Sequence, residues 1–589
     1  MGEAGLAGKA LIERLRLAWH RAVSRLFARL GGFRRHMTAF VSQPEPISIG
    51  SYAKGRQLMA GNFMFAGYLV HTSSASIWEI NRPDREFDAA LQGFAWLDDL
   101  AAVGDRDSRL LAQQWVFEWI DRFGRGRGRG WEPELVGRRT IRWINHGIFL
   151  MKGLDDRRRK RFFASLARQA VYLSRRAGAA PAGLPRFEAL TGLVIAGLSL
   201  EGLGHLAGPA MRAIGEECAR CIDVQGGIPS RNPEELMEIF TLLNWAASAL
   251  GEAGMVPQRG HLEAIEHIAP TLRGLRHSDG SLARFHGGDA GAEGRLDHAL
   301  AASGVRGASK AERVMGYARL AAGRSSVIVD AAAPPEPPHS ANAHASTLAF
   351  ELVSGRQPLI VNCGPGHQFG REWRRAGRVT PSHSTLSVHG YSSSRLVSVL
   401  DGGSGNELLV DGPEVECRRW ADSDGYWMLA SHDGYVEHHG LTHVRKLKLS
   451  IDGRKLSGED SLGCLSENDR MIFEELMNHT AHEGPRFDIR FHLHPDVSAE
   501  IGMGGSAVSL TLPNREIWVF RYAGDAVLSL EASVYLDSGR LKPRAAKQIV
   551  LSGTIMDYSS GVSWSLSREH DGLRHYSMTE TDESLTETR

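Results

Sequence analysis

The spacing of apolar residues changes once along this chain of 589 residues, at about residue 310. Before that point apolar residues recur every three or four positions, as in LLAQQWVFEWIDRFG, where Leu111, Trp115, Trp119 and Phe123 share one stripe. This is the period of an amphipathic helix. After that point the apolar runs are β-branched or alternate with polar residues, which is typical of strands. The chain therefore predicts an all-helical front part and an all-β back part.

The helical part is expected to contain many successive helices, without intervening strands, from about residue 50 to 305. The segment PRFEALTGLVIAGLSLEG is apolar nearly all round, as an inner helix covered on both sides would be. Short and often glycine-rich linkers between such helices predict stacked hairpins, arranged as a solenoid or a closed toroid. We assign this domain to residues 46–308.

The β part is a series of short runs separated by Gly, Asn, Asp or Pro, among them SSVIVDAA, PLIVNCG, FDIRFHLH and EIWVFRYAG. Such spacing predicts stacked antiparallel sheets, which we assign to residues 309–568. Residues 569–589 are polar and acidic, with little to bury, and are expected to form a disordered tail. The predicted fold class is therefore α+β and multidomain.

The net charge of the chain bears on which kinds of partner it can attract. Lys and Arg total 69 and Asp and Glu total 68, so the net charge is +1. Such a chain has no overall electrostatic attraction for nucleic acid, and no nucleic-acid-binding motif is present. We expect no nucleic-acid partner, and any polyanion has to be held by a local cluster of cations.

Residues 1–45 form a basic amphipathic arm. Leu11, Leu15 and Trp19 fall at helical spacing opposite Arg14 and other arginines, and charges interrupt every apolar stretch that a signal peptide would need. We expect this helix to dock on the body of the protein, with weak contact to a membrane surface as the alternative. The missing export signal predicts a cytoplasmic location, and the periplasm or cell envelope is the alternative.

The five cysteines are few and odd in number, which does not favour a disulfide framework. Cys218 and Cys221 form a CxxC within the helical run GEECARCIDV, with no second ligand pair nearby. We interpret them as small residues on a helix rather than as a zinc or redox site.

Six stretches of the sequence are specific enough to compare with known families. In the β part these are HSANAHASTLAFELVSGRQPLIVNCGPG, WRRAGRVTPSHSTLSV and RFHLHPDV, and in the helical part GFAWLDDL, WEPELVGRRTIRWINH and GGIPSRNPEEL. Together they resemble the heparinase II/III family of bacterial polysaccharide lyases. The resemblance implies an N-terminal (α/α) toroid of helical hairpins followed by a C-terminal antiparallel β-sandwich. It also implies β-elimination at a uronic acid of an acidic polysaccharide, such as a glycosaminoglycan or an alginate-like polymer.

That chemistry needs a base, a group that neutralises the carboxylate, and a proton donor to the leaving oxygen. The family's Asn-His pair is absent where GLPRFEALTGL places Arg186 and Glu188, and the expected Tyr is absent near Glu235. Arg231 and Asn232 are the polar groups at that turn and are candidates for binding the substrate carboxylate. The alternative is helix capping, with Asn232 in front of Pro233.

In the β part the family's His-x-His-x-Asp segment becomes Asn342-Ala343-His344-Ala345-Ser346, so the first histidine is replaced. By the same resemblance His344, Asn362 and His383 occupy the positions of a structural zinc site, although an amide is a weaker zinc ligand than a carboxylate. Asn342, His344 and His383 are the remaining catalytic candidates. Two hydrogen-bonded histidines bracing the strands are the alternative to zinc.

The candidate substrate-binding residues are Arg142, Asn145, His146, Glu235 and Tyr391. Asn145-His146 invites comparison with the missing Asn-His pair, although its place matches an earlier helix of the family.

Three functions follow. The first is a polysaccharide lyase that binds an acidic polysaccharide or oligosaccharide in a cleft between toroid and sandwich. The second is a degenerate glycan-binding or envelope-associated protein on the same scaffold, because the expected residues are replaced. The third is a toroid glycoside hydrolase, which needs two carboxylates across a cleft. Its candidates are Asp98, Asp99, Glu234 and Glu235.

Overall fold

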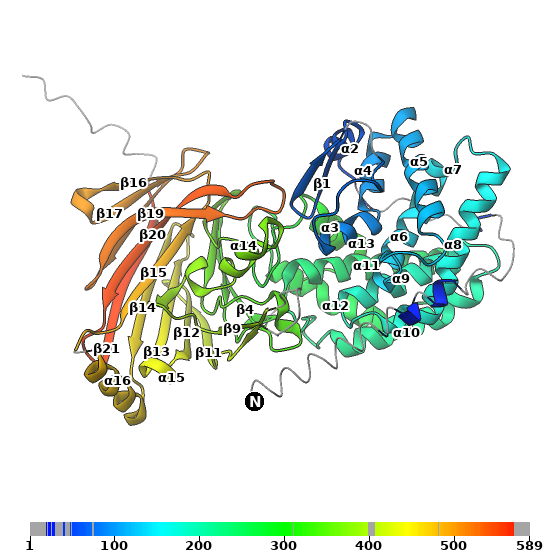
Figure 1. Cartoon of the computed structure of the whole chain (residues 1–589). Helices are drawn as coiled ribbons and strands as arrows, with labels where there is room; N and C mark the ends of the chain where they lie inside the picture. Colours follow the sequence, from blue (N-terminus) through cyan, green and yellow to red (C-terminus); the bar gives the residue numbers. More distant parts are fainter. Residues whose placement is uncertain are drawn as a thin grey trace, which may run out of the picture.

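The computed structural model describes residues 19, 22–24, 26–29, 39–41, 48, 50–72, 76–309, 311–398, 407–480 and 482–569. Helices gather at one end of the molecule and antiparallel sheets at the other (Figure 1). The predicted α+β fold class, an (α/α) toroid followed by a β-sandwich, is confirmed.

The helical domain is built from helices of 5 to 21 residues. They are α2 (Tyr52–Met59), α3 (Arg85–Gln92), α4 (Ala95–Val103), α5 (Arg106–Arg122), α6 (Pro133–Asn145), α7 (Gly147–Met151), α8 (Asp156–Arg176), α9 (Leu184–Ser199), α10 (Ala207–Cys221), α11 (Pro233–Glu252), α12 (Arg259–Gly274) and α13 (Arg295–Ser303).

Helix α9 is the inner helix that the sequence predicts, and nearly all of its residues are buried. It packs on α6, α8, α10 and α11. Glycines set the close approach of α6 and α9: a Cβ at Gly137 would lie 2.2 Å from the carbonyl oxygen of Glu188, and one at Gly192 would lie 2.7 Å from the Cα of Gly137. Larger residues there would push the helices apart and displace the polar side chains beside them.

The prediction of a helical part without strands is wrong at one place. Strands β1 (Asn62–Phe65) and β2 (Tyr68–His71) form an antiparallel hairpin. Ala66 and Gly67 form its turn with φ of 47° and 79°, which is the backbone of a tight hairpin turn. Phe63 and Phe65 bury their rings against the helices, so four-residue strands suffice.

The β domain consists of two large antiparallel sheets and a small hairpin. The nine-stranded sheet has the order β19 (Val527–Tyr535), β20 (Arg544–Thr554), β15 (Arg486–Leu493), β7 (Gln357–Val361), β6 (Phe350–Ser354), β5 (Ser325–Asp330), β4 (Tyr317–Ala322) and β3 (Arg313–Val314), with β8 (Leu386–Val388) paired to β15. The eight-stranded sheet has the order β11 (Val415–Asp422), β12 (Gly425–Tyr435), β13 (Leu441–Ser450), β14 (Lys455–Gly463), β21 (Ser559–Arg568), β18 (Ile517–Ala523), β17 (Ala507–Thr511) and β16 (Ser498–Gly502). The hairpin pairs β9 (Arg395–Ser398) with β10 (Glu407–Val410).

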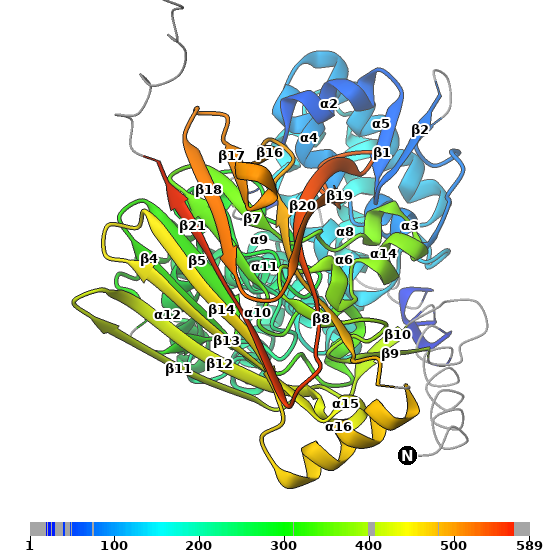
Figure 2. The same ribbon diagram turned by 90° about the vertical axis from the view of Figure 1, so that its left-hand side faces the viewer.

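One core cluster lies between the sheets, where Phe350 and Trp564 stack at 5.6 Å between ring centroids. Helix α16 (Glu467–His479) crosses one end of the eight-stranded sheet, while the middle of that sheet faces the viewer uncovered in Figure 2.

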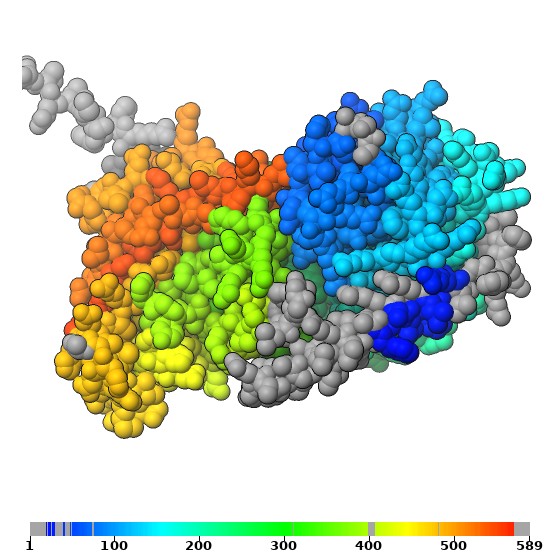
Figure 3. Space-filling view, in the orientation of Figure 1, coloured from blue at the N-terminus to red at the C-terminus, as the bar shows by residue number. Residues whose placement is uncertain are grey.

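The helical domain and the sandwich abut and form one continuous body (Figure 3). Buried polar contacts join them: Arg284 Nη2 donates to the carbonyl oxygen of Leu536 at 2.8 Å, and the Ser538 amide donates to Asp289 Oδ2 at 2.9 Å. The Arg284 guanidinium also lies 4.1 Å from the centroid of the Tyr535 ring.

The predicted N-terminal arm lies mostly outside the described residues, as do residues 570–589 of the predicted tail. Within the arm, residues 22–24 and 26–29 are helical. Arg176 donates to Ser24 Oγ at 3.3 Å, and Ala28 is fully buried, so this part docks on α8. Trp19 and Leu26 are exposed. In the described chain, none of the helices has the length and apolar character needed to cross a bilayer.

Candidate functional site

Five candidate and neighbouring side chains meet where the two domains join, and we call them the interdomain cluster: Arg231, His286, Asp330, His344 and His383. Arg231 precedes α11 and Asp330 ends β5, so the cluster draws on both domains. Arg231 pairs with Asp330, and His286 Nε2 lies 3.3 Å from the second Asp330 oxygen. His344 donates its backbone N–H to His286 Nδ1 at 3.1 Å, and its ring centroid lies 5.1 Å from that of His383. The structure therefore brings three of the catalytic candidates into one corner.

The interdomain cluster is buried, and this burial governs the protonation of its side chains. Burial lowers the pKa of His286 and His344, and it lowers the pKa of His383 to about 3, so all three imidazoles are neutral at neutral pH. Burial alone would raise the pKa of Asp330, but Arg231 and His286 outweigh it and the pKa falls to about 2. The cluster thus holds one compensated ion pair beside three neutral histidines.

The Arg231 guanidinium is already engaged. Besides Asp330, it donates from Nε to the Met315 carbonyl at 3.1 Å and from Nη1 to the Ala332 carbonyl at 3.2 Å. The capping alternative for Asn232 is confirmed, because its Oδ1 accepts the N–H groups of Glu234 at 2.9 Å and Glu235 at 3.1 Å. Carboxylate binding by either residue stays a prediction.

The predicted zinc ligands are only partly arranged as a site. His344 Nδ1 has no hydrogen-bond partner among the described residues, and the rings of His344 and His383 are neutral, as zinc ligands must be. Asn362, however, accepts the Ser384 N–H on Oδ1 at 3.0 Å, and the described chain contains no group of three His, Cys, Asp or Glu residues suited to a metal. The residues therefore do not complete a four-coordinate zinc site, and zinc binding stays a prediction.

The other candidates do not join this corner. Asn342 is exposed and accepts a hydrogen bond from Arg374 at 2.9 Å. Tyr391 is 46% exposed and packs on His439, with 4.6 Å between ring centroids. Glu235 accepts the Ser230 hydroxyl at 2.7 Å.

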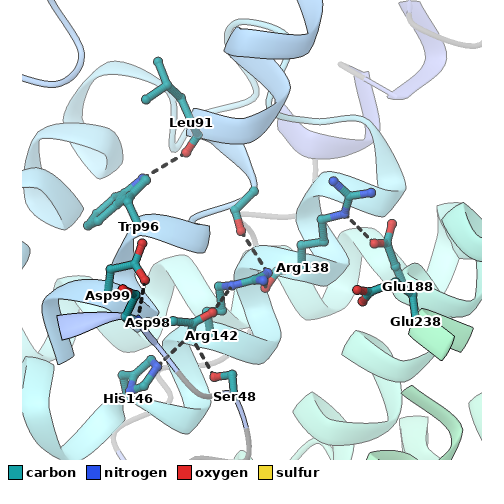
Figure 4. Close-up of polar contacts among 12 residues, drawn as sticks. Ser48, Leu91, Trp96, Asp98, Asp99, Arg138, Arg142, His146, Glu188 and Glu238 are labelled. Carbon is teal, nitrogen blue, oxygen red and sulfur yellow. Dashed lines mark hydrogen bonds and ion pairs between the residues drawn. The ribbon is translucent and has the colours of Figure 1, made fainter. Parts of the chain in front are cut away.

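A second polar cluster lies inside the helical domain, where Asp98 on α4 gathers Ser48, Arg142 and His146 (Figure 4). Arg142 Nε lies 2.8 Å from Asp98 Oδ2, while His146 Nε2 and Ser48 Oγ each lie 2.8 Å from Oδ1. Burial would raise the pKa of Asp98, yet Arg142 and His146 lower it to about 2. Two predicted substrate-binding residues, Arg142 and His146, are thus brought together by a shared counter-ion. Asn145, beside them in sequence, is buried, and its amide has no hydrogen-bond partner in the described part of the chain.

Asp98 and Arg142 also line a cavity of about 930 Å³. Its other walls come from α11, α12 and α13 and include Trp245, Glu266 and Arg295. The cavity thus lies beside a predicted substrate-binding residue, Arg142, and its mixed charges do not select for a polyanion.

Arg138 and Glu188 continue the polar strip between α6 and α9, with 2.5 Å between Nε and Oε1 (Figure 4). Glu188 is the residue noted where the family has its Asn-His pair, and burial raises its pKa despite Arg138. Glu134, one turn before Arg138 on α6, forms no ion pair in the described part of the chain, and burial raises its pKa to about 7 although Arg138 opposes the shift.

Replacing Glu134 by glutamine is expected to stabilise the protein at pH 8 and to leave it unchanged at pH 4. The folded-state pKa lies above the ordinary value of 4.5, so the stability linked to the protonated carboxyl is present below pH 4.5 and is lost as pH rises to about 7. The gain at pH 8 should reach about 2–3 kcal/mol, since one pKa unit corresponds to about 1.4 kcal/mol. Thermal unfolding at both pH values measures it. Glu263→Gln, at an exposed helix pair, is the control, and equal gains at pH 4 and pH 8 would contradict the assignment.

Each of the four carboxylates considered for a hydrolase accepts a hydrogen bond from within the protein. Asp99 accepts the Ser51 N–H at 2.7 Å, Glu234 accepts the Asp289 N–H at 2.9 Å, and Asp98 and Glu235 are bonded as described above. No pair of them therefore stands free across a cleft within the described residues.

Sequence reasoning missed Asp330 and His286, although Asp330 closes the buried run SSVIVDAA. A charged residue at the end of a fully buried strand signals a buried partner, but nothing in the sequence names Arg231 as that partner.

An (α/α) toroid joined to an antiparallel β-sandwich, with polar clusters at their junction and inside the toroid, defines a protein of the polysaccharide-lyase architecture. Residues 305–565 match the family model described as heparinase II/III-like, C-terminal. Over 544 residues, 90% of each chain, the sequence is 31% identical to FtsZ-localized protein C of Caulobacter vibrioides. The chain belongs to the heparinase II/III-like family.

Solved structures show the same fold. A crystal structure of heparinase III matches with a TM-score of 0.64 at 12% identity, covering 95% of this chain and 92% of that one. A mutant of the heparan sulfate lyase HepC from Pedobacter heparinus matches with a TM-score of 0.56 at 13% identity, covering 95% and 90%. At these identities the likeness concerns the fold alone.

Proposed function

We propose that this chain is a non-catalytic member of the heparinase II/III-like family that associates with FtsZ in a dividing bacterium. The observation that carries the proposal is the 31% identity, over 90% of both chains, to a protein named for its localisation with FtsZ. The aligned region covers both domains of this chain, which favours a role that both proteins share and that uses both domains.

The interdomain cluster supports the non-catalytic part of the proposal. A base or proton donor has to reach the substrate, yet His344 is 3% and His383 0% exposed, and burial lowers the pKa of both, which makes them weak bases and leaves them no acidic proton to donate at neutral pH. Arg231 directs its donors to Asp330 and to backbone carbonyls rather than outward. Such an arrangement stabilises the domain junction and leaves little for chemistry. A cytoplasmic location, expected from the sequence, agrees with the proposal and stays a prediction.

Lyase activity on an acidic polysaccharide is the second candidate function. The family fold favours it, and the cavity of about 930 Å³ offers room for a saccharide, although the charges that line it are mixed. Such activity has to overcome the burial of the interdomain histidines. It would need groups other than the buried histidines, and Arg142 at the cavity wall is the residue we would test first.

One experiment separates the two. Full-length protein is incubated with FtsZ of the source bacterium and GTP, then sedimented, and a second aliquot is incubated with alginate, glycosaminoglycan and bacterial exopolysaccharide. We expect the protein to pellet only with FtsZ polymers and to release no ultraviolet-absorbing unsaturated uronate.

Heparinase III is the matched control, because it has the same fold: it should release product and stay in the supernatant. Release of unsaturated product by this chain would establish the lyase, and loss by Arg142→Ala would place the activity in the helical cavity. Failure to sediment with FtsZ would overturn the proposed association.

A further inference from the structure

The outer face of the eight-stranded sheet carries a shallow groove of about 440 Å³. It crosses β12, β13, β14, β21 and β18, on the face turned toward the viewer in Figure 2, away from the helical domain. We call it the sheet groove, and define it by Trp427, Lys446, Lys448, Ser457, Ser565 and Arg521.

The strand register aligns most of these residues in one row. Trp420 pairs with Trp427, Trp427 with Lys448, Lys448 with Ser457, Ser457 with Ser565 and Ser565 with Arg521. Paired residues of neighbouring strands project from the same face. Five strand spacings of about 4.8 Å make the row roughly 24 Å long. An elongated ligand fits this row better than a single ion.

The cations at one end are held in place. The Nζ atoms of Lys446 and Lys448 lie 5.0 and 4.5 Å from the centroid of the Trp427 ring, and Trp420 stacks on that ring at 5.8 Å and 5°. Cation–π contact orients the two ammonium groups without neutralising them. Lys448 also lies 3.4 Å from Asp424 at the rim. Glu459, which the register pairs with Lys446, also lines the groove, so Asp424 and Glu459 are two carboxylates beside the three cations Lys446, Lys448 and Arg521.

The three cations lie together on this face, whereas positive and negative charges nearly cancel over the whole chain, whose net charge is +1. Ser457, Ser563 and Ser565 form the middle of the groove, where short hydroxyl side chains leave a flat floor of donors and acceptors. Strands β13, β14 and β21 are hydrogen-bonded on both edges, so a peptide cannot add to them as a further strand. An anionic, hydroxyl-rich ligand matches the cations and the serines together.

We propose that the sheet groove binds an acidic saccharide chain. The site lies on the face opposite the domain junction, and it depends neither on the interdomain cluster nor on the association with FtsZ. The same protein could then bind a glycan on this face while its helical domain contacts another partner.

The test is a titration of the full-length protein with oligogalacturonate and with a heparin oligosaccharide, which separate carboxylated from sulfated ligands. A neutral cello-oligosaccharide of matched length and polyglutamate are the comparison ligands. We expect saturable binding of an acidic oligosaccharide that weakens as salt is added, with no binding of the neutral chain. The double variant Lys446→Gln/Lys448→Gln should weaken binding at least tenfold.

The control variant Lys152→Gln/Lys542→Gln removes the same charge at exposed positions outside the groove and should bind like the natural protein. Unchanged thermal midpoints verify that both variants fold. Binding that survives Lys446→Gln/Lys448→Gln would place the ligand elsewhere and overturn the proposal. Polyglutamate binding as tightly as the saccharides, or absence of binding by either acidic saccharide, would also overturn it.

Discussion

Replacing Asp330 by asparagine is expected to lower the free energy of unfolding by about 3–5 kcal/mol, because it leaves a buried arginine without its counter-ion. Asp330 is fully buried, pairs with Arg231 through one oxygen, and accepts the Ser346 hydroxyl on the other at 2.6 Å. Asparagine keeps the shape but not the charge. In thermal unfolding the midpoint should fall by about 5–10 °C.

The pH dependence gives an independent check. The pKa of Asp330 is about 2 in the folded protein, against an ordinary value of 3.8. The stability from this carboxylate is therefore present above pH 3.8 and is lost as pH falls toward 2, and Asp330→Asn should remove that part of the acid sensitivity.

Asp297→Asn is the matched control, because Asp297 pairs with Arg276 at 60% side-chain exposure and should contribute less than about 1 kcal/mol. The double variant Arg231→Met/Asp330→Leu removes both charges and should recover most of the lost stability. A thermal midpoint unchanged in Asp330→Asn would mean that Arg231 reaches solvent or another anion, and the picture of the cluster as a structural junction would fail.

Replacing Asp460 by asparagine is expected to have a comparable effect, confined to the sandwich. Asp460 is fully buried and lies 2.7 Å from Arg445 Nε and 2.8 Å from His443 Nε2, and it accepts the Trp564 indole N–H at 2.8 Å. Burial would raise its pKa, but Arg445 and His443 lower it well below the ordinary range. Arg445 also donates to the Leu348 carbonyl at 2.7 Å and so ties the two sheets together.

The free energy of unfolding should again fall by about 3–5 kcal/mol in Asp460→Asn, and urea unfolding measures this change. Tryptophan fluorescence follows the transition, and Trp564, whose indole loses a charged acceptor, is one of the 13 tryptophans that contribute to it. Asp424→Asn, at an exposed pair with Lys448, is the control and should leave stability within about 0.5 kcal/mol. Asp330→Asn should loosen the domain junction and speed proteolysis near residue 308, whereas Asp460→Asn should unfold the sandwich first. Identical proteolysis patterns would contradict this division.

Much of the fold could be predicted from the sequence. The runs SSVIVDAA, FDIRFHLH and EIWVFRYAG correspond to β5, β15 and β18, and the inner helix is α9. Strands β11 to β14 are not among the runs named from the sequence, although apolar and polar residues alternate in them, as in LTHVRKLKLS of β13. The sheet groove crosses three of these strands, β12, β13 and β14, together with β21 and β18.

The candidate site was less accessible to sequence reasoning. The resemblance pointed to Arg231, His344 and His383, which meet, and to Asn342 and Tyr391, which lie apart from them. The capping role of Asn232 was foreseeable, because Asn before Pro at a helix start is a local signal.

The sequence by itself determined the order of helices and strands, the family and the near neutrality of the chain, because hydrophobic period, long motifs and charge are properties of neighbouring residues. Only the tertiary structure decided which charges meet. Arg231 and Asp330 are 99 residues apart in sequence, and their ionisation depends on burial and on each other. Desolvation and Coulomb energy act through space, so the neighbours of a residue along the chain do not determine its charge partner, and here Arg231 and Asp330 join two domains.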